Sequence, residues 1–253
     1  MYKFNAQEEK DCLVQWIKNW FEKNGPDCNA VLGMSGGKDS TIVAALLVEA
    51  LGKDRVIGVG MPDHRQDLND ADKICKYLGI RFINAPIGGI INGFNGMWYS
   101  FGDEDFRWSE QSQQNIPPRV RMTMLYAIAQ TFNGRVVGTT NLDERLTGYF
   151  TKFGDGLACD VEPIEMLTVN EILEIGESLK IPHEWLYRVP SADLPHTKTD
   201  EEELGFSYKD FGDYIRGIQM PDKETVSKIE ERIKKNAFKL KPIAHFDPGF
   251  FKN

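Results

Sequence analysis

The sequence predicts an α/β protein with a mainly parallel sheet and helices on both faces. Short apolar runs with strand character alternate with segments of helical periodicity through about residues 25–165. Several of these runs end in turns rich in glycine or polar residues, and the last third of the chain is more helical. Strand–helix alternation of this kind gives parallel strands joined by crossover helices. We therefore expect one domain over residues 1–253, with an α/β core at about 25–165 and a helical part at about 166–253.

The first half of the chain is predicted to contain three helices and three strands. Residues 6–23 carry Trp16, Ile17 and Trp20 at helical spacing. Gly52 and Gly79 mark the ends of two later helices, because glycine readily adopts the backbone conformation that closes a helix. In chain order, we expect helix 6–23, strand 30–32, helix 41–51, strand 56–61, helix 68–78 and strand 81–87.

The second half is predicted to be dominated by helices and one further strand. We expect helix 118–132, strand 135–139, and then helices 168–180, 207–217 and 222–238. A polar, proline-containing loop precedes helix 207–217, and we predict that its residues 193–205 form a lid over a site. The acidic run Asp200–Glu203 within this loop fits an ordinary solvated surface equally well.

Charge and composition argue against several classes of protein. The chain carries 30 Lys and Arg against 38 Asp and Glu, a net charge of -8, which disfavours binding to nucleic acid because that affinity depends on neutralised phosphates. No apolar run approaches the roughly 20 residues that span a bilayer, so we expect no membrane partner. The N-terminus lacks a basic-then-apolar signal pattern, which predicts a cytoplasmic protein. Four cysteines without a C-x-x-C pair argue against a zinc ribbon or a redox pair.

The most informative stretch is GMSGGKDS at Gly33–Ser40, between a predicted strand and a predicted helix. Adjacent glycines let backbone N–H groups approach an anion closely, and the N-terminus of the following helix adds partial positive charge. The stretch is not a Walker loop, because Leu32 replaces its first glycine and Asp39 replaces the hydroxyl residue after the lysine. A turn that binds nothing and only caps its helix is the alternative, and the complete S-G-G-x-D-S pattern disfavours it.

Two carboxylates in the predicted core suggest a metal ion. A carboxylate beside bound phosphates is repelled by them unless a cation lies between, so Asp39 predicts Mg²⁺. Glu144 follows a predicted strand end, where side chains from neighbouring loops can converge. By itself, Glu144 would more often be a solvated residue at a helix start, and the surrounding sequence pattern reverses this interpretation.

Several blocks of the sequence resemble one family. SGGKDS is typical of the ATP pyrophosphatase, or PP-loop, superfamily, whose members cut ATP between the α and β phosphates. The blocks IPPRVRMTMLYAIAQ, VVGTTNLDERLTGYFTKFGDGLACDVEPI, PSADL and TDEEELGFSY resemble those of ammonia-dependent NAD synthetase, in the same order from residue 11 to about 240. The resemblance implies a Rossmann-like, adenine nucleotide alpha hydrolase-like fold. It also implies a C–N ligase that amidates deamido-NAD with free ammonia, at the expense of ATP and with Mg²⁺, through an NAD-adenylate, in the last step of NAD biosynthesis.

The resemblance also implies roles for individual residues. Ser35, Asp39 and Glu144 would be catalytic, with Asp39 and Glu144 as the magnesium ligands. The residues implied for ATP binding are Gly33, Met34, Ser35, Gly36, Gly37, Lys38, Asp39, Ser40, Met61, Thr139 and Ser191. Those implied for deamido-NAD binding are Asn115, Arg119, Lys152, Asp155, Asp160, Phe238 and Lys239.

Three positions depart from the pattern of the family. Val169 stands where a lysine that contacts ATP is expected, so that charge is either missing or supplied by Lys38. Gly60 replaces an arginine often found at the end of the second strand, and Phe238 replaces the histidine of a C-terminal His-Lys pair. The Ser35, Asp39 and Glu144 group is intact, which predicts an active enzyme.

The sequence also bears on the nitrogen donor, the oligomeric state and the alternative functions. Glutamine-using relatives carry an additional hydrolase domain for which this chain has no space, so free ammonia is the expected donor, although a separate partner subunit would also fit. The resemblance implies a homodimer, and the aromatic stretch 98–108 with helix 118–132 can build its interface or can equally belong to the core. Two other functions stay open: a PP-loop enzyme that adenylates a different acceptor, such as tRNA or a small acid, and a non-catalytic nucleotide-binding module.

Overall fold

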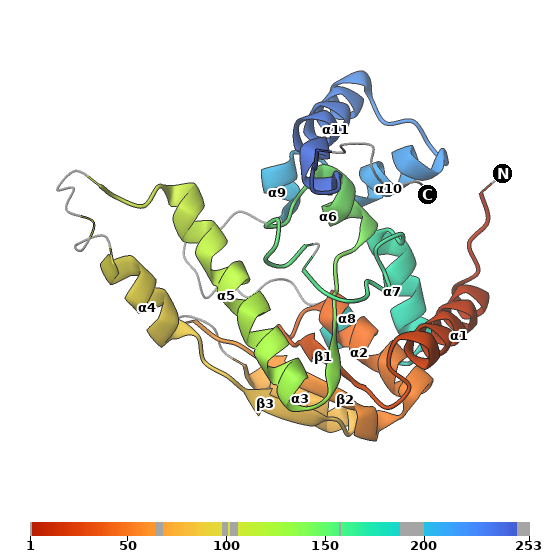
Figure 1. Ribbon diagram of the computed structural model, residues 1–253. Helices are drawn as coiled ribbons and strands as arrows, with labels where there is room; N and C mark the ends of the chain where they lie inside the picture. The colour runs from red at the N-terminus through yellow and green to blue at the C-terminus, as the bar shows by residue number, and fades with distance from the viewer. Residues whose placement is uncertain are drawn as a thin grey trace.

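A four-stranded parallel sheet in the order β3-β2-β1-β4 forms the centre of the computed structural model, which describes residues 2–63, 68–97, 101, 106–156, 158–187 and 200–246 (Figure 1). Its strands are β1 (Asn29–Gly33), β2 (Val56–Gly60), β3 (Arg81–Asn84) and β4 (Gly134–Val137). The chain adds β2 and β3 on one side of β1 and then returns to place β4 on the other side. In such a sheet the ligand site lies where the strand order reverses, here at the carboxyl ends of β1 and β4.

Helices cover both faces of the sheet, as predicted. One face packs against α1 (Ala6–Asn24), α2 (Lys38–Leu51), α3 (Asn69–Leu78), α7 (Val169–Ser178) and α8 (His183–Leu186), through a core that includes Leu32 of β1. The other face packs against α4 (Gly88–Gly96) and α5 (Glu110–Thr131), through a core that includes Val31 of β1. Because Leu32 and Val31 alternate along β1, this strand is buried on both faces, as expected of a central parallel strand.

The C-terminal third forms a smaller helical layer. It contains α9 (Asp200–Leu204), α10 (Tyr208–Arg216), α11 (Lys223–Asn236) and the 3-10 helix Ala237–Leu240. Leu204, Phe206, Phe211 and Ile229 form its core, and α6 (Leu142–Thr147) packs against it (Figure 1). Since α6 directly follows the end of β4, this layer stands beside the carboxyl ends of the strands.

Some element boundaries differ from the sequence prediction. The predicted helix 118–132 begins earlier, at Glu110, and continues through Pro117 and Pro118. Proline is favoured at the start of a helix, but here both prolines lie inside it. The structure adds the short helices α4, α6 and α8, and residues 200–204 of the predicted lid form α9 rather than a loop. Among the described residues, no helix has both the length and the apolar content needed to cross a membrane.

Candidate active site

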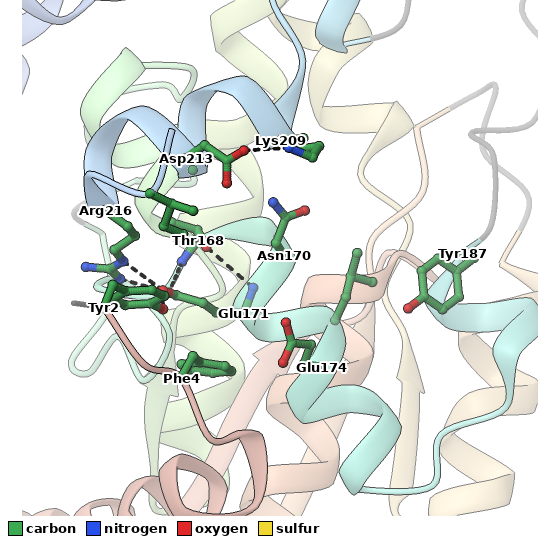
Figure 2. Close-up of a pocket in the computed structure, with 13 residues that line it drawn as sticks. Tyr2, Phe4, Thr168, Asn170, Glu171, Glu174, Tyr187, Lys209, Asp213 and Arg216 are labelled. Carbon is green, nitrogen blue, oxygen red and sulfur yellow. Dashed lines mark hydrogen bonds and ion pairs between the residues drawn. The ribbon is translucent and has the colours of Figure 1, made fainter. Parts of the chain in front are cut away.

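A cavity of about 450 Å³ lies between the N-terminal segment, α7 and α10 (Figure 2). At one end of it, Arg216 forms a bidentate ion pair with Glu171, with N–O distances of 2.7 and 2.8 Å, and the Tyr2 hydroxyl donates to the same carboxylate. Burial alone would raise the pKa of Glu171, but hydrogen bonds from Arg216, Tyr2 and the Thr168 N–H outweigh it and lower that pKa. None of the predicted site residues lines this cavity. These contacts fasten the N-terminus to α7 and α10.

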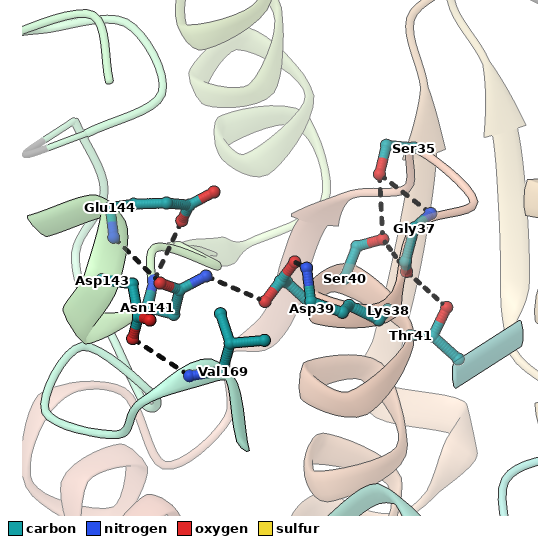
Figure 3. A network of polar contacts seen from close by, with 10 residues as sticks. All are labelled: Ser35, Gly37, Lys38, Asp39, Ser40, Thr41, Asn141, Asp143, Glu144 and Val169. Carbon is teal, nitrogen blue, oxygen red and sulfur yellow. Dashed lines mark hydrogen bonds and ion pairs between the residues drawn. The ribbon is translucent and has the colours of Figure 1, made fainter. Parts of the chain in front are cut away.

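The glycine-rich stretch Gly33–Ser40 forms a tight loop between β1 and α2 (Figure 3). Gly36 has φ +82°, a conformation that favours glycine. The Ser35 hydroxyl accepts from the Gly37 N–H at 3.2 Å and lies 3.2 Å from the Ser40 hydroxyl. α2 begins at Lys38, and no side chain caps its N-terminus. The loop therefore places a helix N-terminus and two hydroxyls where an anion can bind.

Asn141 joins this loop to the carboxyl end of β4. Its side-chain amide donates to Asp39 Oδ1 at 3.1 Å. Its side-chain oxygen accepts from the Glu144 N–H at 3.0 Å, and its own N–H donates to Glu144 Oε2 at 3.1 Å, which completes a capping box at the start of α6. Asn141 is 1% exposed. It was not among the predicted site residues, although Asn three residues before Glu is a sequence pattern of a capping box.

The carboxylates at this junction lie in a poorly solvated environment. Burial, together with the charge of Asp39, raises the pKa of Glu144 well above its ordinary value. Burial also raises the pKa of Asp143 to about 7. The Lys38 ammonium lies 3.2 Å from Asp39 Oδ2. Several acidic groups in a low-dielectric setting favour a bound cation.

Val169 lies beside these carboxylates but brings no charge. It is 3% exposed at the N-terminus of α7, and its N–H donates to Asp143 Oδ2 at 3.0 Å. The other carboxylate oxygen of Asp143 has no hydrogen-bond partner among the described residues. Lys38 is close enough to lower the pKa of both Asp143 and Glu144 electrostatically. Lys38 thus supplies positive charge in the region where position 169 supplies none.

The side chains of Asp39 and Glu144 are oxygen donors of the kind that Mg²⁺ prefers. Within the part of the chain that the structure describes, no group of three or more His, Cys, Asp or Glu side chains could hold a metal by itself. The two carboxylates are instead bridged by Asn141 beside the anion-binding loop. Mg²⁺ is commonly held by one or two carboxylates together with substrate phosphates and water, so this donor set matches its preference.

The end of β2 forms a further wall of the loop. Met61 is 6% exposed, and its methyl carbon lies 3.4 Å from the point where a Cβ on Gly33 would stand. The Met61 carbonyl accepts from Arg121 Nε at 3.2 Å. Burial lowers the pKa of Arg121, and the charges of Asp63 and Asp155 oppose that effect. Arg121 was missed from the sequence, since only the fold brings its guanidinium to the end of β2.

Five residues predicted to contact the dinucleotide meet at the turn 148–156. Thr151 donates from its hydroxyl to Asn115 Oδ1 at 2.6 Å and from its N–H to Asp155 Oδ1 at 2.6 Å. The carbonyl of Lys152 accepts from Arg119 Nη2 at 3.5 Å. Lys239 donates to the carbonyls at the start of the turn, Gly148 and Phe150, at 2.6 and 2.8 Å. The structure thus gathers Asn115, Arg119, Lys152, Asp155 and Lys239 around one segment.

Other predicted residues have different surroundings. Asp160 accepts from the Val136 N–H at 2.7 Å and from the Tyr126 hydroxyl at 3.3 Å, beside β4. Phe238 is 60% exposed. Thr139 follows β4, next to the Asn141 junction. Ser191 and residues 193–199 of the predicted lid lie outside the described residues.

The acidic run Asp200–Glu203 lies in α9, and two of its carboxylates make contacts within the protein. Glu203 Oε2 accepts from the Tyr149 hydroxyl at 2.8 Å, and Glu201 Oε1 accepts from the Tyr208 N–H at 2.7 Å. Tyr208 also lies beneath the Lys38 ammonium, 5.4 Å from ring centroid to nitrogen. The segment after the predicted lid therefore reaches the anion-binding loop.

The sequence of this chain is similar to those of known proteins. A family model described as NAD synthase matches residues 10–243. The NH(3)-dependent NAD(+) synthetase of Methanosarcina acetivorans is 38% identical over 217 residues, which cover 84% of this chain and 82% of the relative.

Solved structures give the same comparison. The NMN synthetase of Francisella tularensis superposes with a TM-score of 0.84 at 31% identity and covers 98% of this chain and 100% of its own. The NH3-dependent NAD synthetase of Campylobacter jejuni superposes with a TM-score of 0.75 at 30% identity, covering 97% and 100% of the two chains. The sheet, the helices on its two faces and the helical C-terminal part are therefore shared with these proteins.

Proposed function

Because this chain belongs to the NAD synthase family, we propose how its site performs ammonia-dependent NAD synthesis, the ATP-driven reaction of these C–N ligases. The observation that carries the proposal is the junction in which Asn141 joins Asp39 of the anion-binding loop to Glu144 of α6. Two carboxylates meet there beside the uncapped N-terminus of α2. This arrangement suits a nucleoside triphosphate bound with a divalent cation.

ATP would lie across the carboxyl ends of β1, β2 and β4. The backbone N–H groups of Gly33–Ser40 and the hydroxyls of Ser35 and Ser40 would bind its phosphates, assisted by Lys38. Met61 and Thr139, which follow β2 and β4, would contact the rest of the nucleotide, and Ser191 would add a hydroxyl. The buried Met61 side chain against Gly33 supports this placement.

Mg²⁺ is proposed to bind to Asp39 and Glu144. Its chemical contribution, when bound, is to neutralise the negative charge of the phosphates. The raised pKa of Glu144, which results from burial and from the charge of Asp39, supports a cation at this position. Asn141 keeps the two carboxylates beside each other, and its hydrogen bond to Asp39 leaves the second oxygen of that carboxylate beside Lys38.

The reaction requires an activated carboxyl group, because a carboxylate has no good leaving group for displacement by ammonia. In our account the nicotinate carboxylate attacks the α-phosphorus of ATP, and pyrophosphate leaves. Ammonia then attacks the carbonyl carbon of the adenylate and loses a proton, and AMP leaves with one of the carboxylate oxygens. The loop N–H groups and Ser35 would stabilise the charge of the departing pyrophosphate.

The dinucleotide would occupy the surface around the turn 148–156. Arg119 and Lys152 would supply positive charge for its phosphates or its carboxylate, while Asn115 and Asp155 would shape the turn. Lys239 approaches the turn from the C-terminal layer, and Phe238 beside it remains a proposed contact. Asp160 also remains a proposed contact, with its carboxylate held by the Val136 N–H.

We also propose a homodimer formed through the aromatic stretch 98–108, of which the structure describes residues 101 and 106–108, and through residues 118–132, most of which lie in α5. Phe94, Met97 and Phe101 are 38%, 48% and 44% exposed in this region. The Phe101 ring lies edge-on to that of Phe106 with centroids 4.9 Å apart, and α4 and the N-terminal half of α5 extend away from the sheet (Figure 1). Exposed aromatic clusters of this kind commonly mark interaction surfaces. A single domain, a cytoplasmic site of action and the absence of a nucleic-acid partner remain predictions from the sequence.

Amidation of the corresponding mononucleotide, to give NMN, is a second candidate function. The observation that favours it is the TM-score of 0.84 to the NMN synthetase of Francisella tularensis. Both reactions use the same adenylation of a nicotinate carboxylate, so the loop and the metal junction would serve either one. They differ in whether a second nucleotide must be bound.

An assay that compares two acceptor substrates tests the proposal. Purified protein with MgATP and ammonium chloride is given deamido-NAD or nicotinate mononucleotide, and NAD, NMN, AMP and pyrophosphate are quantified. We expect NAD in a one-to-one ratio with AMP, and neither product from an Asp39→Ala variant. A higher kcat/KM for the mononucleotide would transfer the proposal to the second candidate, while absence of AMP formation with either acceptor would refute both.

A further inference from the structure

Glu162 is a half-buried acid that none of the predicted roles uses. It follows Val161, whose carbonyl accepts from the Gly138 N–H at 2.8 Å, so the segment 160–162 lies alongside the end of β4. Its carboxylate accepts from the Thr140 N–H at 3.1 Å and lies 3.2 Å from the Thr140 hydroxyl. Thr140 is 7% exposed. Glu162 therefore binds the loop between β4 and α6 through two contacts to one residue.

Gly138 leaves the space that this carboxylate occupies. A Cβ on Gly138 would stand 2.2 Å from the carboxyl carbon of Glu162, far inside contact distance. Even an alanine at this position would push the carboxylate away from Thr140. The small residue and the acid are thus complementary in shape.

The Thr140 hydroxyl has one proton but two acceptors within 3.2 Å: Glu162 Oε1 and the carbonyl of Asp155. Burial raises the pKa of Glu162 to about 7, with a smaller contribution from the charge of Glu165, while hydrogen bonds from Cys159 and Thr140 oppose the shift. When Glu162 is protonated, it can donate to the Thr140 hydroxyl, which then donates to the Asp155 carbonyl. The contact between Glu162 and Thr140 can therefore be made in both protonation states.

Asn141 directly follows Thr140 in the sequence and contacts both proposed magnesium ligands. Its amide donates to Asp39 Oδ1, and its N–H donates to Glu144 Oε2, each at 3.1 Å. We propose that Glu162 is a positioning residue: by fixing Thr140, it fixes the peptide from which Asn141 aligns the carboxylates of Asp39 and Glu144. This inference rests on the proposed function, because it assigns Glu162 a role toward the metal and ATP of that same site.

Three variants test the proposal. Glu162→Leu removes the hydrogen bonds at similar volume, whereas Glu162→Gln can still accept from the Thr140 N–H and donate to its hydroxyl. Glu165→Leu is the matched control, because Glu165 lies in the same segment but instead pairs with Arg145 at 2.7 Å. Three quantities are measured: the affinity for Mn²⁺, the KM for ATP, and Tm. Electron paramagnetic resonance reports Mn²⁺ binding, in the presence of an ATP analogue that has a methylene group between the α and β phosphorus atoms.

Loss of a residue that orients metal ligands weakens metal binding about 10- to 100-fold, and we expect this loss in Glu162→Leu. Glu162→Gln should restore most of the affinity, and Glu165→Leu should bind like the original protein. Wild-type Mn²⁺ affinity in a folded Glu162→Leu variant would overturn the inference, as would equal losses in the Leu and Gln variants.

If Glu162→Leu does not fold, the pair Thr140→Val and Thr140→Ser replaces it. Thr140→Val removes the hydroxyl contacts alone and should weaken Mn²⁺ binding, while Thr140→Ser should retain it; equal affinities of the two would overturn the inference. The unaltered protein distinguishes failure of the proposed function from failure of the role assigned to Glu162. Its failure to bind Mn²⁺ with the analogue would contradict the proposed function, whereas normal binding that is insensitive to these substitutions would contradict only the role of Glu162.

Discussion

Replacement of Asn141 by alanine should impair both stability and catalysis. The substitution removes two side-chain hydrogen bonds, one to Asp39 Oδ1 at 3.1 Å and one from the Glu144 N–H at 3.0 Å. The backbone contact from Asn141 to Glu144 Oε2 would lose the half of the capping box that supports it. Since Asn141 is 1% exposed, water cannot readily replace the missing groups.

The size of the effect follows from these two bonds. Loss of an N-cap side chain costs about 1 kcal/mol, and loss of a hydrogen bond to a charged group costs about 1.5–3 kcal/mol. The side chain of Asp39 keeps 20% exposure, which favours the lower end of that range. We expect the free energy of unfolding to fall by about 2–4 kcal/mol, which lowers Tm by roughly 5–15 °C for a chain of this length. Misalignment of the metal ligands should also reduce kcat/KM for ATP by about 10- to 100-fold.

The assay combines differential scanning calorimetry with steady-state kinetics at saturating ammonia. Asn19→Ala is the matched control, because Asn19 is exposed on α1 and its side chain accepts from Gln15 Nε2 at 2.9 Å. The control should retain Tm and activity. If Asn141→Ala matched the control in both measurements, the junction between the loop and α6 would not have the role assigned to it.

Three further predictions concern charge and backbone conformation. Mg²⁺ binding with an ATP analogue should release protons, because the pKa of Glu144 is raised in the metal-free protein and the cation favours the ionised carboxylate. Calorimetry in buffers of different ionisation enthalpy measures this release, and a binding enthalpy that does not depend on the buffer would contradict it. Glu171→Gln should destabilise the fold by about 2–3 kcal/mol at pH 7 through loss of the bidentate pair with Arg216. Folding lowers the pKa of Glu171, so its contribution to the free energy of unfolding is present above the unfolded pKa and is lost as pH falls through the folded pKa. The Tm difference between the variant and the original protein should therefore narrow in acid. A difference that does not depend on pH would refute this. Gly36→Val should weaken binding of the ATP analogue by at least about 10-fold, because a β-branched residue is strained at φ +82° in the anion-binding loop. Isothermal titration measures the affinity, and an affinity equal to that of the original protein would contradict this prediction.

The sequence predicted the parts of the fold that depend on local pattern. The apolar runs around Val31, Val59 and Val136 were predicted to be strands because they are short, rich in valine and bounded by glycine or other turn residues. The structure confirms that all three are buried parallel strands. The start of α5 was placed wrongly at residue 118. Proline at the first turn is a strong helix-start signal, and the sequence did not show that the segment from Glu110 is capped by Ser109 and continues through two prolines.

The candidate site was predictable only where a motif names it. The loop Gly33–Ser40 was predicted from its spacing, which has a physical reason, whereas Glu144 was predicted through the resemblance of the surrounding sequence to the family. Arg121 and Glu162 were not found, since each acts through a backbone group far away in sequence: the Met61 carbonyl for Arg121 and the Thr140 N–H for Glu162. Contacts between a side chain and a distant main chain leave no spacing signal in one sequence.

Transfer of oxygen-18 from the acceptor to AMP is the most direct test of the central claim that this site activates a nicotinate carboxylate by adenylation. Deamido-NAD labelled with oxygen-18 in both carboxylate oxygens is incubated with the protein, MgATP and ammonium chloride, and the AMP and pyrophosphate are analysed by mass spectrometry. Because the attacking oxygen stays on the α-phosphorus when the amide forms, the account predicts one labelled oxygen in each AMP and none in pyrophosphate. Unlabelled AMP, or label in pyrophosphate, would contradict it.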